Sequence, residues 1–268
     1  MENLQNKAFN IRKNILEMIF TASSGHPGGA LSCADLLTAL YFSEMKIDKD
    51  CPQDKNRDRL VLSKGHASAA LYATLAEIGF ISKEELLGFR NINSILQGHP
   101  DMRRIPGVDM STGSLGQGLS AANGMALAGK LDSKSYRVYC IMGDGEIEEG
   151  QIWEAAMTAS HYQLDNLCAI VDNNNLQIDG TVTEVMNVNP IDEKFRSFGF
   201  HVINIDGHNI DQILQAFEEA RNTKGKPTVI VAKTIKGKGI SFMENQAGWH
   251  GKAPSKEEYE IAQKELSK

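Results

Sequence analysis

The stretch YRVYCIMGDGEIEEGQIWEAAMTASHYQLDNLCAIVDNNN, residues 136–175, holds two short apolar runs separated by one amphipathic segment. Residues 136–142 and 167–172 have the length and the β-branched and aliphatic content of buried strands, and residues 150–162 have helical spacing. A strand, a helix and a second strand in this order predict a right-handed βαβ unit with parallel strands. Both strands end in polar loops, Gly143-Asp144-Gly145 and Asn173-Asn174-Asn175.

The same alternation extends along the rest of the chain. Further strands are expected at residues 60–62, 200–205 and 228–232, with helices at 4–22, from about 32, at 67–78, from the Gly-rich turn 112–118 to about 131, and at 210–222. We therefore expect an α/β fold of three layers, α/β/α, with a parallel central sheet. No repeat or low-complexity linker divides the chain. We expect one domain, 1–268, in which residues 233–268 form a C-terminal loop and a short helix (255–266).

Composition excludes several classes of function. The 268 residues include 28 Lys and Arg against 34 Asp and Glu, a formal net charge of −6. Because this balance leaves no broad basic face, we expect neither nucleic-acid nor membrane binding. The polar N-terminus lacks the pattern of a secretory signal. The four cysteines form no CxxC pair, which is typical of reduced thiols in a cytoplasmic protein; they are Cys33, Cys51, Cys140 and Cys168.

The two polar loops carry oxygen ligands. Asp144 offers a carboxylate, and Asn174 offers an amide oxygen thirty residues later. In open parallel sheets, ligands bind beyond the carboxyl ends of the strands. An all-oxygen set suits Mg²⁺ or Ca²⁺ and is poor for zinc, and Mg²⁺ often completes its coordination with phosphate oxygens. The loops therefore predict a metal-bound diphosphate. The G-x-G-x-x-G and G-x-x-x-x-G-K-[ST] motifs are absent, which argues against a nicotinamide Rossmann enzyme or a P-loop ATPase.

Histidines beside glycines give a second signal. Five of the seven have a glycine neighbour, and such residues can hydrogen-bond a ligand or move protons: His26, His66, His99, His208 and His250. Of these, His208 precedes a helix and is interpreted as structural, as are His161 and His201. Three acidic residues, Glu146, Glu148 and Glu149, follow Gly145. The helix dipole accounts for two of them without a function.

These residues together resemble the thiamine-diphosphate enzymes, whose signature is Gly-Asp-Gly, a gap near thirty residues, and Asn-Asn. Five further blocks resemble the transketolase family: Ser24-Gly25-His26-Pro27-Gly28, Ser63-Lys64-Gly65-His66, Gly98-His99-Pro100, Thr112-Gly113-Ser114-Leu115-Gly116-Gln117-Gly118 and Ile178-Asp179-Gly180. Deoxyxylulose-phosphate synthase shares the metal signature but usually lacks the proline of the first block. The loop at residues 235–254, which holds His250, departs from long-chain transketolases.

The resemblance implies a role for each matching residue. Mg²⁺, for which Ca²⁺ or Mn²⁺ can substitute, would be bound by Asp144, Asn174 and the carbonyl of Leu176. The diphosphate end of the cofactor would be bound by Gly145, Asn174, His66 and His250, and the aminopyrimidine by Gly113, Ser114 and Leu115. Sugar hydroxyls and protons would be handled by His26, His99 and His250. Glu149 matches an acidic residue at the subunit contact near the cofactor.

The reaction implied by the resemblance is ketol transfer. A two-carbon unit moves from a ketose phosphate to an aldose phosphate with thiamine diphosphate and Mg²⁺, as in the pentose phosphate pathway. In transketolases a glutamate from the pyrimidine-binding domain of the neighbouring subunit completes the site. Because no second βαβ domain fits into residues 233–268, we expect a separate C-terminal subunit to supply it. We expect two copies of each chain around a two-fold axis.

Three alternatives remain open. An E1α-like subunit of a 2-oxoacid dehydrogenase would use the same cofactor, but it does not explain the glycine-flanked histidines. A non-catalytic regulatory subunit would keep the fold without the chemistry. A ketol transferase for a non-standard sugar is the third, since the residues that grip the sugar phosphate lie mainly in the domain that follows in the family. The donor, the acceptor and the pathway are therefore not predicted.

Overall fold

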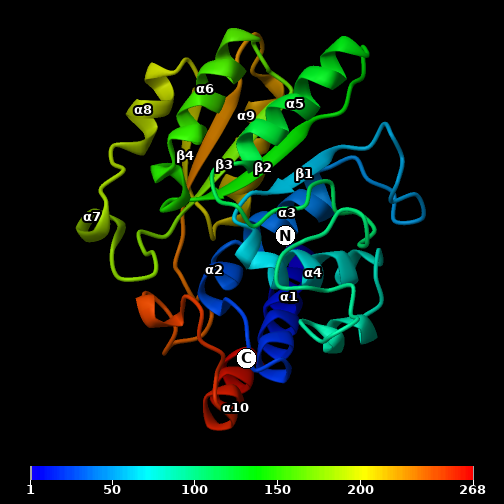
Figure 1. Cartoon of the computed structure of the whole chain (residues 1–268), viewed down its shortest axis with the longest axis vertical. Coiled ribbons are helices and arrows are strands. Elements are labelled where there is room, and N and C mark those ends of the chain that lie inside the picture. Colours follow the sequence, from blue (N-terminus) through cyan, green and yellow to red (C-terminus); the bar gives the residue numbers. More distant parts are fainter. Residues whose placement is uncertain (1, 268) are drawn as a thin grey trace.

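The computed structural model describes residues 2–267, and its sheet has five parallel strands in the order β1-β2-β3-β5-β4 (Figure 1). In chain order the strands are β1 (Arg59–Leu62), β2 (Val138–Gly143), β3 (Leu167–Asn173), β4 (His201–Asp206) and β5 (Thr228–Lys233). The predicted α/β class and parallel sheet are confirmed. Gly143 lies opposite Asp172 in the β2–β3 register, so the two predicted ligand loops leave the sheet side by side.

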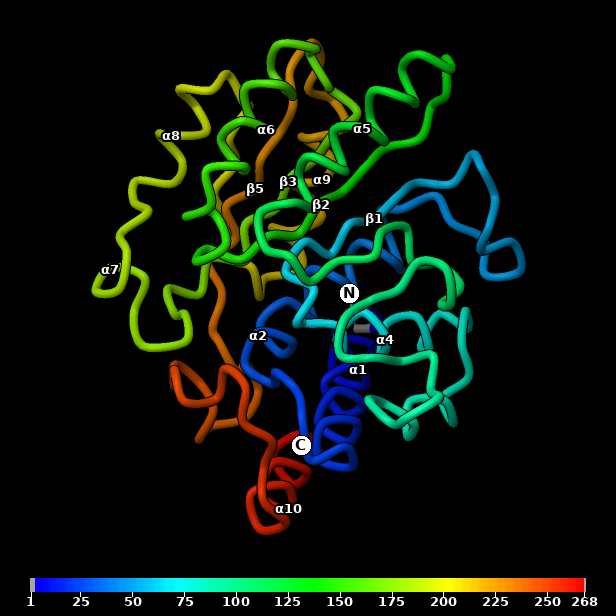
Figure 2. Tube along the Cα trace, viewed as in Figure 1, coloured from blue at the N-terminus to red at the C-terminus, as the bar shows by residue number. Residues whose placement is uncertain are grey.

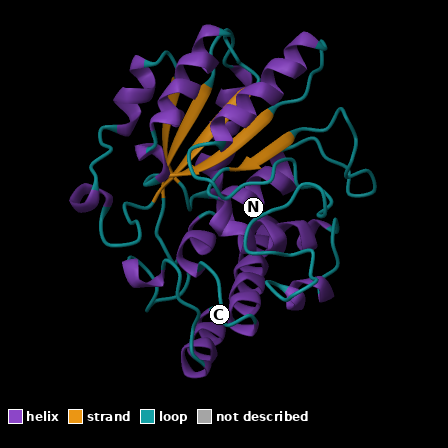
Figure 3. Cartoon of the chain, in the orientation of Figure 1, coloured by secondary structure: helices purple, strands orange, loops and turns teal. Residues whose placement is uncertain are grey.

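Helices cover both faces of this sheet (Figure 3). One layer contains α5 (Gly118–Leu131), α6 (Gly150–His161) and α8 (Ile191–Ser197); the other contains α1 (Glu2–Thr21), α3 (Ala34–Ala39), α4 (Ser68–Ile78) and α9 (Ile210–Asn222). Alternate residues of a buried strand enter opposite cores, since strand side chains have a period of two. In β2, Tyr139 and Ile141 pack with α1 and α9, whereas Val138 and Cys140 pack with α5 and α6.

The first Gly-rich block is more helical than its sequence suggests. The pattern predicts a helix from about Ser32, but α2 (Pro27–Ser32) begins at the proline and leads into α3 and a π-helical turn at Leu40–Glu44. Proline at the first helical position is favourable because its missing N–H has no partner there anyway. The result is that His26 stands at the N-terminus of a buried helix.

The loops between the strands also contain short helices. Two helices, α7 (Val182–Val185) and α8, stand where the sequence predicts one, and 3₁₀ turns occur at Gly65–Ala67, Glu84–Gly88, Glu146–Glu148 and Ala247–Trp249. No other regular element interrupts residues 92–109, which agrees with the predicted loop. Within residues 2–267, none of the helices combines the length and apolar character that a membrane crossing needs.

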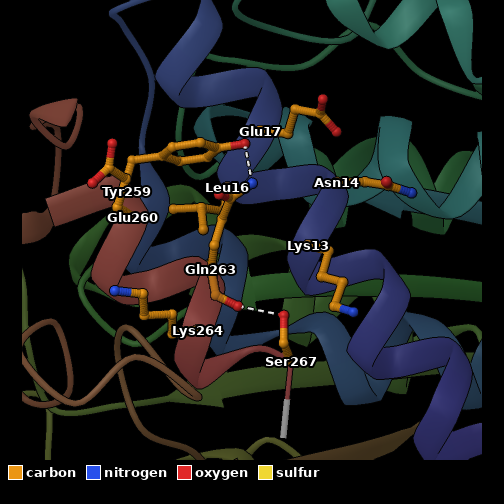
Figure 4. A pocket seen from close by; sticks show the side chains of 9 residues that line it. All are labelled: Lys13, Asn14, Leu16, Glu17, Tyr259, Glu260, Gln263, Lys264 and Ser267. Atoms are coloured by element: carbon orange, nitrogen blue, oxygen red, sulfur yellow. Dashed lines mark hydrogen bonds between the residues drawn. The ribbon is translucent and has the colours of Figure 1, made fainter. Parts of the chain in front are cut away.

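The C-terminal segment ends in α10 (Lys256–Glu265), which packs beside α1 although the two are far apart in the sequence (Figure 2). The Phe20 and Tyr259 rings stack with centroids 3.9 Å apart. The groove between these helices is lined by charged and amide side chains such as Lys13, Glu17 and Gln263, and by none of the predicted site residues (Figure 4). The segment thus closes the helical layer away from the ligand loops.

Candidate functional site

A cavity of about 260 Å³ opens at the carboxyl ends of β2 and β3. It collects residues from several separate stretches of the chain, at the position expected for a ligand on a parallel sheet. The lining residues are His26, Gly29, Lys64, His66, Gly113, Leu115, Gly143, Asp144, Gly145, Glu146, Asn174, Leu176, Gln177, Ile178, Lys236 and His250. Most of the predicted site residues therefore meet in one place.

The two ligand loops converge as predicted. The Asp144 carboxylate accepts hydrogen bonds from the backbone N–H of Gly145, at 2.9 Å, and of Asn175. The Asn174 amide oxygen accepts one from Leu176 N, at 3.1 Å. Burial, followed by the nearby charge of Asp172, raises the pKa of Asp144 to about 6 although its hydrogen bonds act to lower it. A buried carboxylate of this kind favours a neighbouring cation, because the cation stabilises its charged form.

The donor set fits Mg²⁺ better than a transition metal. No group of three His, Cys, Asp or Glu within residues 2–267 could hold a metal ion. The predicted set instead joins one carboxylate, one amide oxygen and the Leu176 carbonyl, and Mg²⁺ accepts such oxygens along with water and phosphate. The Lys236 ammonium lies 3.0 Å from that carbonyl, so the oxygen already faces positive charge.

Beneath the cavity, a buried cluster of polar residues joins the loops to the sheet. We use this name for Ser32, Lys64, Asp172 and Thr234. The Asp172 carboxylate accepts hydrogen bonds from Ser32, at 2.6 Å, and from Lys64 and Thr234. Lys64 also donates to the Gly29 carbonyl at 2.8 Å. Although burial acts to raise it, the Lys64 charge lowers the pKa of Asp172, so the two form a charged pair.

Three histidine rings stand together on the cavity wall. The ring centroids of His26, His66 and His250 are 5.2 to 5.5 Å apart. Burial is the main cause that lowers their pKa values, to about 4 for His26, about 2 for His66 and about 3 for His250. Because these values lie far below 7, all three rings are neutral at neutral pH and have one donor and one acceptor nitrogen each.

The other predicted residues lie around the rim of the cavity. Gly113 and Leu115 line it, whereas Ser114 between them does not. His99 does not line the cavity; its ring packs against Gly113, where a Cβ would lie 2.9 Å from the His99 Cδ2. Glu149 lies outside the cavity and packs against Gly116. Of the predicted set, Ser114, His99 and Glu149 are therefore placed near the cavity without lining it.

Glu146 corrects one interpretation made from the sequence. The helix dipole explains an acidic residue after Gly145 that faces solvent, but the Glu146 side chain is buried and turns inward. It accepts hydrogen bonds from Ser63 and from the backbone N–H of Gly116 and Gly143, the latter two at 3.0 Å. One carboxylate thus ties three Gly-containing loops together around the cavity.

Four further residues were missed by sequence reasoning. Lys64 and Gln177 lie next to or within predicted motifs, and that proximity was the available signal. Lys236 looked like part of a charged surface loop, yet it is buried in the cavity wall. Arg90 carried no signal, because only the fold brings it to His26, where its Nη2 lies 3.5 Å from the ring Nδ1.

The histidines interpreted as structural have partners that agree with that role. His208 Nδ1 lies 2.7 Å from the Asp35 carboxylate, and its Nε2 accepts a hydrogen bond from Ile235 N at 2.8 Å. His201 pairs with Glu219 on the surface, and the ring of His161 lies against Tyr162. None of the three lines the cavity.

Similar proteins point to one family. Residues 4–267 match the family model described as "Transketolase, thiamine diphosphate binding domain". The chain is 45% identical over 267 residues to one of the subunits named for the apulose-4-phosphate transketolase of Phocaeicola vulgatus, covering all of this chain and 95% of that protein. It is 50% identical over 266 residues to the 6-deoxy-6-sulfo-D-fructose transketolase subunit SqwG of a Clostridium species, covering 99% and 97%. Human transketolase is 43% identical over 94% of this chain.

Solved structures agree. A transketolase from Campylobacter jejuni superposes with a TM-score of 0.94 at 37% identity, and one from Leishmania mexicana with 0.92 at 32%. The chain covers 43% and 41% of those two proteins and 40% of human transketolase, so it spans about two fifths of the long relatives. The fold, the matched length and the converging loops agree with the resemblance read from the sequence. This chain belongs to the transketolase family and matches its thiamine diphosphate binding domain.

Proposed function

We propose that this chain is the cofactor-binding, N-terminal subunit of a two-chain transketolase that transfers a two-carbon ketol unit between sugars. The observation that supports this most is the cavity, in which Asp144, Asn174 and three neutral histidines surround one polar space. The chain also spans nearly the whole length of two relatives that are named as transketolase subunits. An E1α-like or regulatory role explains these histidines less well.

The cofactor and metal would be held by the strand-end loops. Asp144, Asn174 and the Leu176 carbonyl would bind Mg²⁺, and Gly145, Asn174, His66 and His250 would bind the diphosphate. Gly113, Ser114 and Leu115 would contact the aminopyrimidine from the rim. When bound, thiamine diphosphate supplies the electron sink for cleavage of the ketose. The chain's own contribution is to neutralise the diphosphate charge and to exclude water on one side of the site.

The substrate would enter beside the histidines. We assign His26, His99 and His250 to the sugar hydroxyls and to proton transfer, and Glu149 to the subunit contact. His99 is placed at the rim, where it can meet the part of the sugar that lies farthest from the diphosphate. Glu149 is not fully buried, which leaves its carboxylate available to a second chain.

A partner chain would complete the cavity. Leu115 and Ile178 line it and yet remain 38% and 67% exposed, which is unusual for apolar residues at a binding site unless something covers them. A C-terminal, pyrimidine-binding subunit would bury them and supply the missing carboxylate. We propose two copies of each chain. Because the cysteines are free and mostly buried, we place the assembly in the cytoplasm.

The substrate class is a ketose donor and an aldose acceptor with an anionic end. Standard pentose phosphates fit this class. So do the apulose 4-phosphate and 6-deoxy-6-sulfofructose in the names of the two relatives. We place no residue of this chain on the anionic group, since the partner would hold it.

The test combines the chain with the product of a neighbouring candidate gene. The pair, with Mg²⁺ and thiamine diphosphate, should transfer a ketol unit from xylulose 5-phosphate or from a deoxysulfo- or branched ketose to an aldose, and each chain alone should not. In calorimetry, Asp144→Ala should abolish Mg²⁺-dependent cofactor binding, while Asp132→Ala, an exposed control, should keep it. Full turnover by the isolated chain would refute the two-chain assignment, and unchanged cofactor affinity in Asp144→Ala would refute the metal site.

A further inference from the structure

Two of the three cavity histidines contact a cation through the same ring edge. Lys236 Nζ lies 2.9 Å from Nδ1 of His250, and Arg90 Nη2 lies 3.5 Å from Nδ1 of His26. A guanidinium and an ammonium have only donors. Both Nδ1 atoms are therefore the accepting nitrogens. In a neutral imidazole the single proton then stands on Nε2.

Arg90 is held in place without an acidic partner. Its backbone adopts φ +60°, and its N–H donates to the Leu96 carbonyl at 2.8 Å. Nη1 donates to Ser24 Oγ at 3.3 Å, and the guanidinium packs against Gly98, where a Cβ would lie 2.8 Å from Cζ. Within residues 2–267 no carboxylate forms an ion pair with it, and its buried Nε has no hydrogen-bond partner. Its charge is thus directed at the histidines rather than neutralised.

Lys236 has a similar relation to His250. The side chain is buried, and its ammonium donates to the Leu176 carbonyl and contacts Nδ1 of His250. Burial lowers the pKa of Lys236 to about 8, with Lys64 as the next cause. The group therefore remains largely protonated at neutral pH and keeps its donors.

We propose that Arg90 and Lys236 are positioning residues that fix the tautomer of His26 and His250, so that both rings offer a neutral Nε2–H donor to the cavity. The ligand would then be an acceptor, a carbonyl, hydroxyl or phosphate oxygen. Its identity as a sugar or cofactor oxygen rests on the proposed function, whereas the tautomer does not. Within residues 2–267 neither Nε2 has another hydrogen-bond partner, so both donors are available.

The electrostatic environment supports this assignment. For His26, burial is the first cause of a lowered pKa, followed by the charge of Arg90 and then by His99 and Lys236. For His250, burial is followed by Lys236, His26 and Lys64. The cations both orient the ring and oppose a second proton. A ring in this state stabilises negative charge that develops on a ligand oxygen without first having to lose a proton.

The tautomers can be measured directly on the full chain. Two-bond ¹H–¹⁵N correlation spectra at pH 7.5, assigned with His26→Asn and His250→Asn, should show the Nε2–H pattern for both rings. In Arg90→Met, which removes the donors, His26 should become a mixture of tautomers while His250 is unchanged; Lys236→Met should do the reverse. Arg90→Lys should restore the His26 pattern. Arg104→Met and Lys238→Met, cations of neighbouring loop positions, should change neither ring.

Kinetics with the partner chain add a second measurement. Arg90→Met should lower kcat/KM at least tenfold without altering cofactor affinity, and Arg90→Lys should recover most of it. An Nδ1–H or doubly protonated His26 in the unmodified chain would overturn the proposal, as would an unchanged His26 spectrum in folded Arg90→Met. Failure of the ketol-transfer assay with correct tautomers would instead count against the proposed function alone.

Discussion

The buried cluster and the cavity wall lie next to each other, and both are polar, yet their hydrogen bonding is opposite. The buried cluster is Ser32, Lys64, Asp172 and Thr234; the cavity wall is His26, His66, Asp144 and His250. In the cluster, Asp172 accepts hydrogen bonds from three side chains, one of them a cation. On the wall, His26 and His250 have free Nε2 donors, and burial raises the pKa of Asp144.

The difference separates residues that hold the fold from residues that a ligand would satisfy. Polar groups in a low-dielectric interior are costly unless they are satisfied, so a satisfied set stabilises one arrangement of the loops. An unsatisfied set costs stability and persists where a ligand supplies the missing partner. Three predictions test this division, starting from the largest effect.

Removing the cation of the buried cluster should have the largest effect. Lys64→Met leaves the Asp172 carboxylate without a charge partner at a position with 0% exposure. The free energy of unfolding should fall by about 3–5 kcal/mol, the usual cost of breaking a buried pair. Urea unfolding of the chain without cofactor measures this. Lys233→Met, an exposed neighbour of the cluster, serves as control and should change stability by less than about 0.5 kcal/mol.

The double variant Lys64→Met/Asp172→Asn sharpens the same comparison. It removes the uncompensated charge, so part of the lost stability should return. A loss below about 1 kcal/mol in Lys64→Met, or no recovery in the double variant, would mean that the cluster is not held by the charge of the pair.

The cavity wall should make stability depend on pH. The pKa of His66 is lowered by burial to about 2, against about 6.5 in an unfolded chain. As pH falls below 6.5, the unfolded chain takes up the proton and the folded chain does not, so the stability present above pH 6.5 is lost. By pH 4 this amounts to about 3 kcal/mol for one histidine. His66→Asn should lack this contribution.

The measurement is the difference between the unfolding free energies of the unmodified chain and His66→Asn from pH 7.5 to 4. The two curves should converge as pH falls, since the other histidines contribute equally to both. His161→Asn, an exposed control, should give a curve parallel to the unmodified chain. Parallel curves for His66→Asn would show that the ring is charged in the folded state.

The smallest effect on stability is expected at Asp144. Asp144→Asn removes a buried charge but also one acceptor for the backbone N–H of Gly145 or Asn175. These effects oppose each other, so the stability of the cofactor-free chain should change by less than about 1 kcal/mol. Addition of Mg²⁺ and thiamine diphosphate should raise the melting temperature of the unmodified chain only. A large loss in the cofactor-free variant would make Asp144 a structural residue.

Local patterns were sufficient for the elements and for the ligand loops. The strands at 167–172 and 228–232 differ from the observed bounds by one residue at the carboxyl end, because their apolar runs are buried on both faces. Asp144 and Asn174 could be paired in advance because parallel strands end at one edge. The first helix after His26 is predicted too late in the chain, since two glycines disguise a helix that packing stabilises.

The sequence by itself determined the α/β class, the order of strands and helices, and the polar loops that mark the site, because each follows from periodicity and from residue types within a short window. Only the tertiary structure decided that Lys64 pairs with Asp172, 108 residues away, and that Arg90 and Lys236 contact the cavity histidines. Such contacts depend on loop paths and on which side chains the fold buries together. Burial then sets the charge of each group, a property that no local pattern contains.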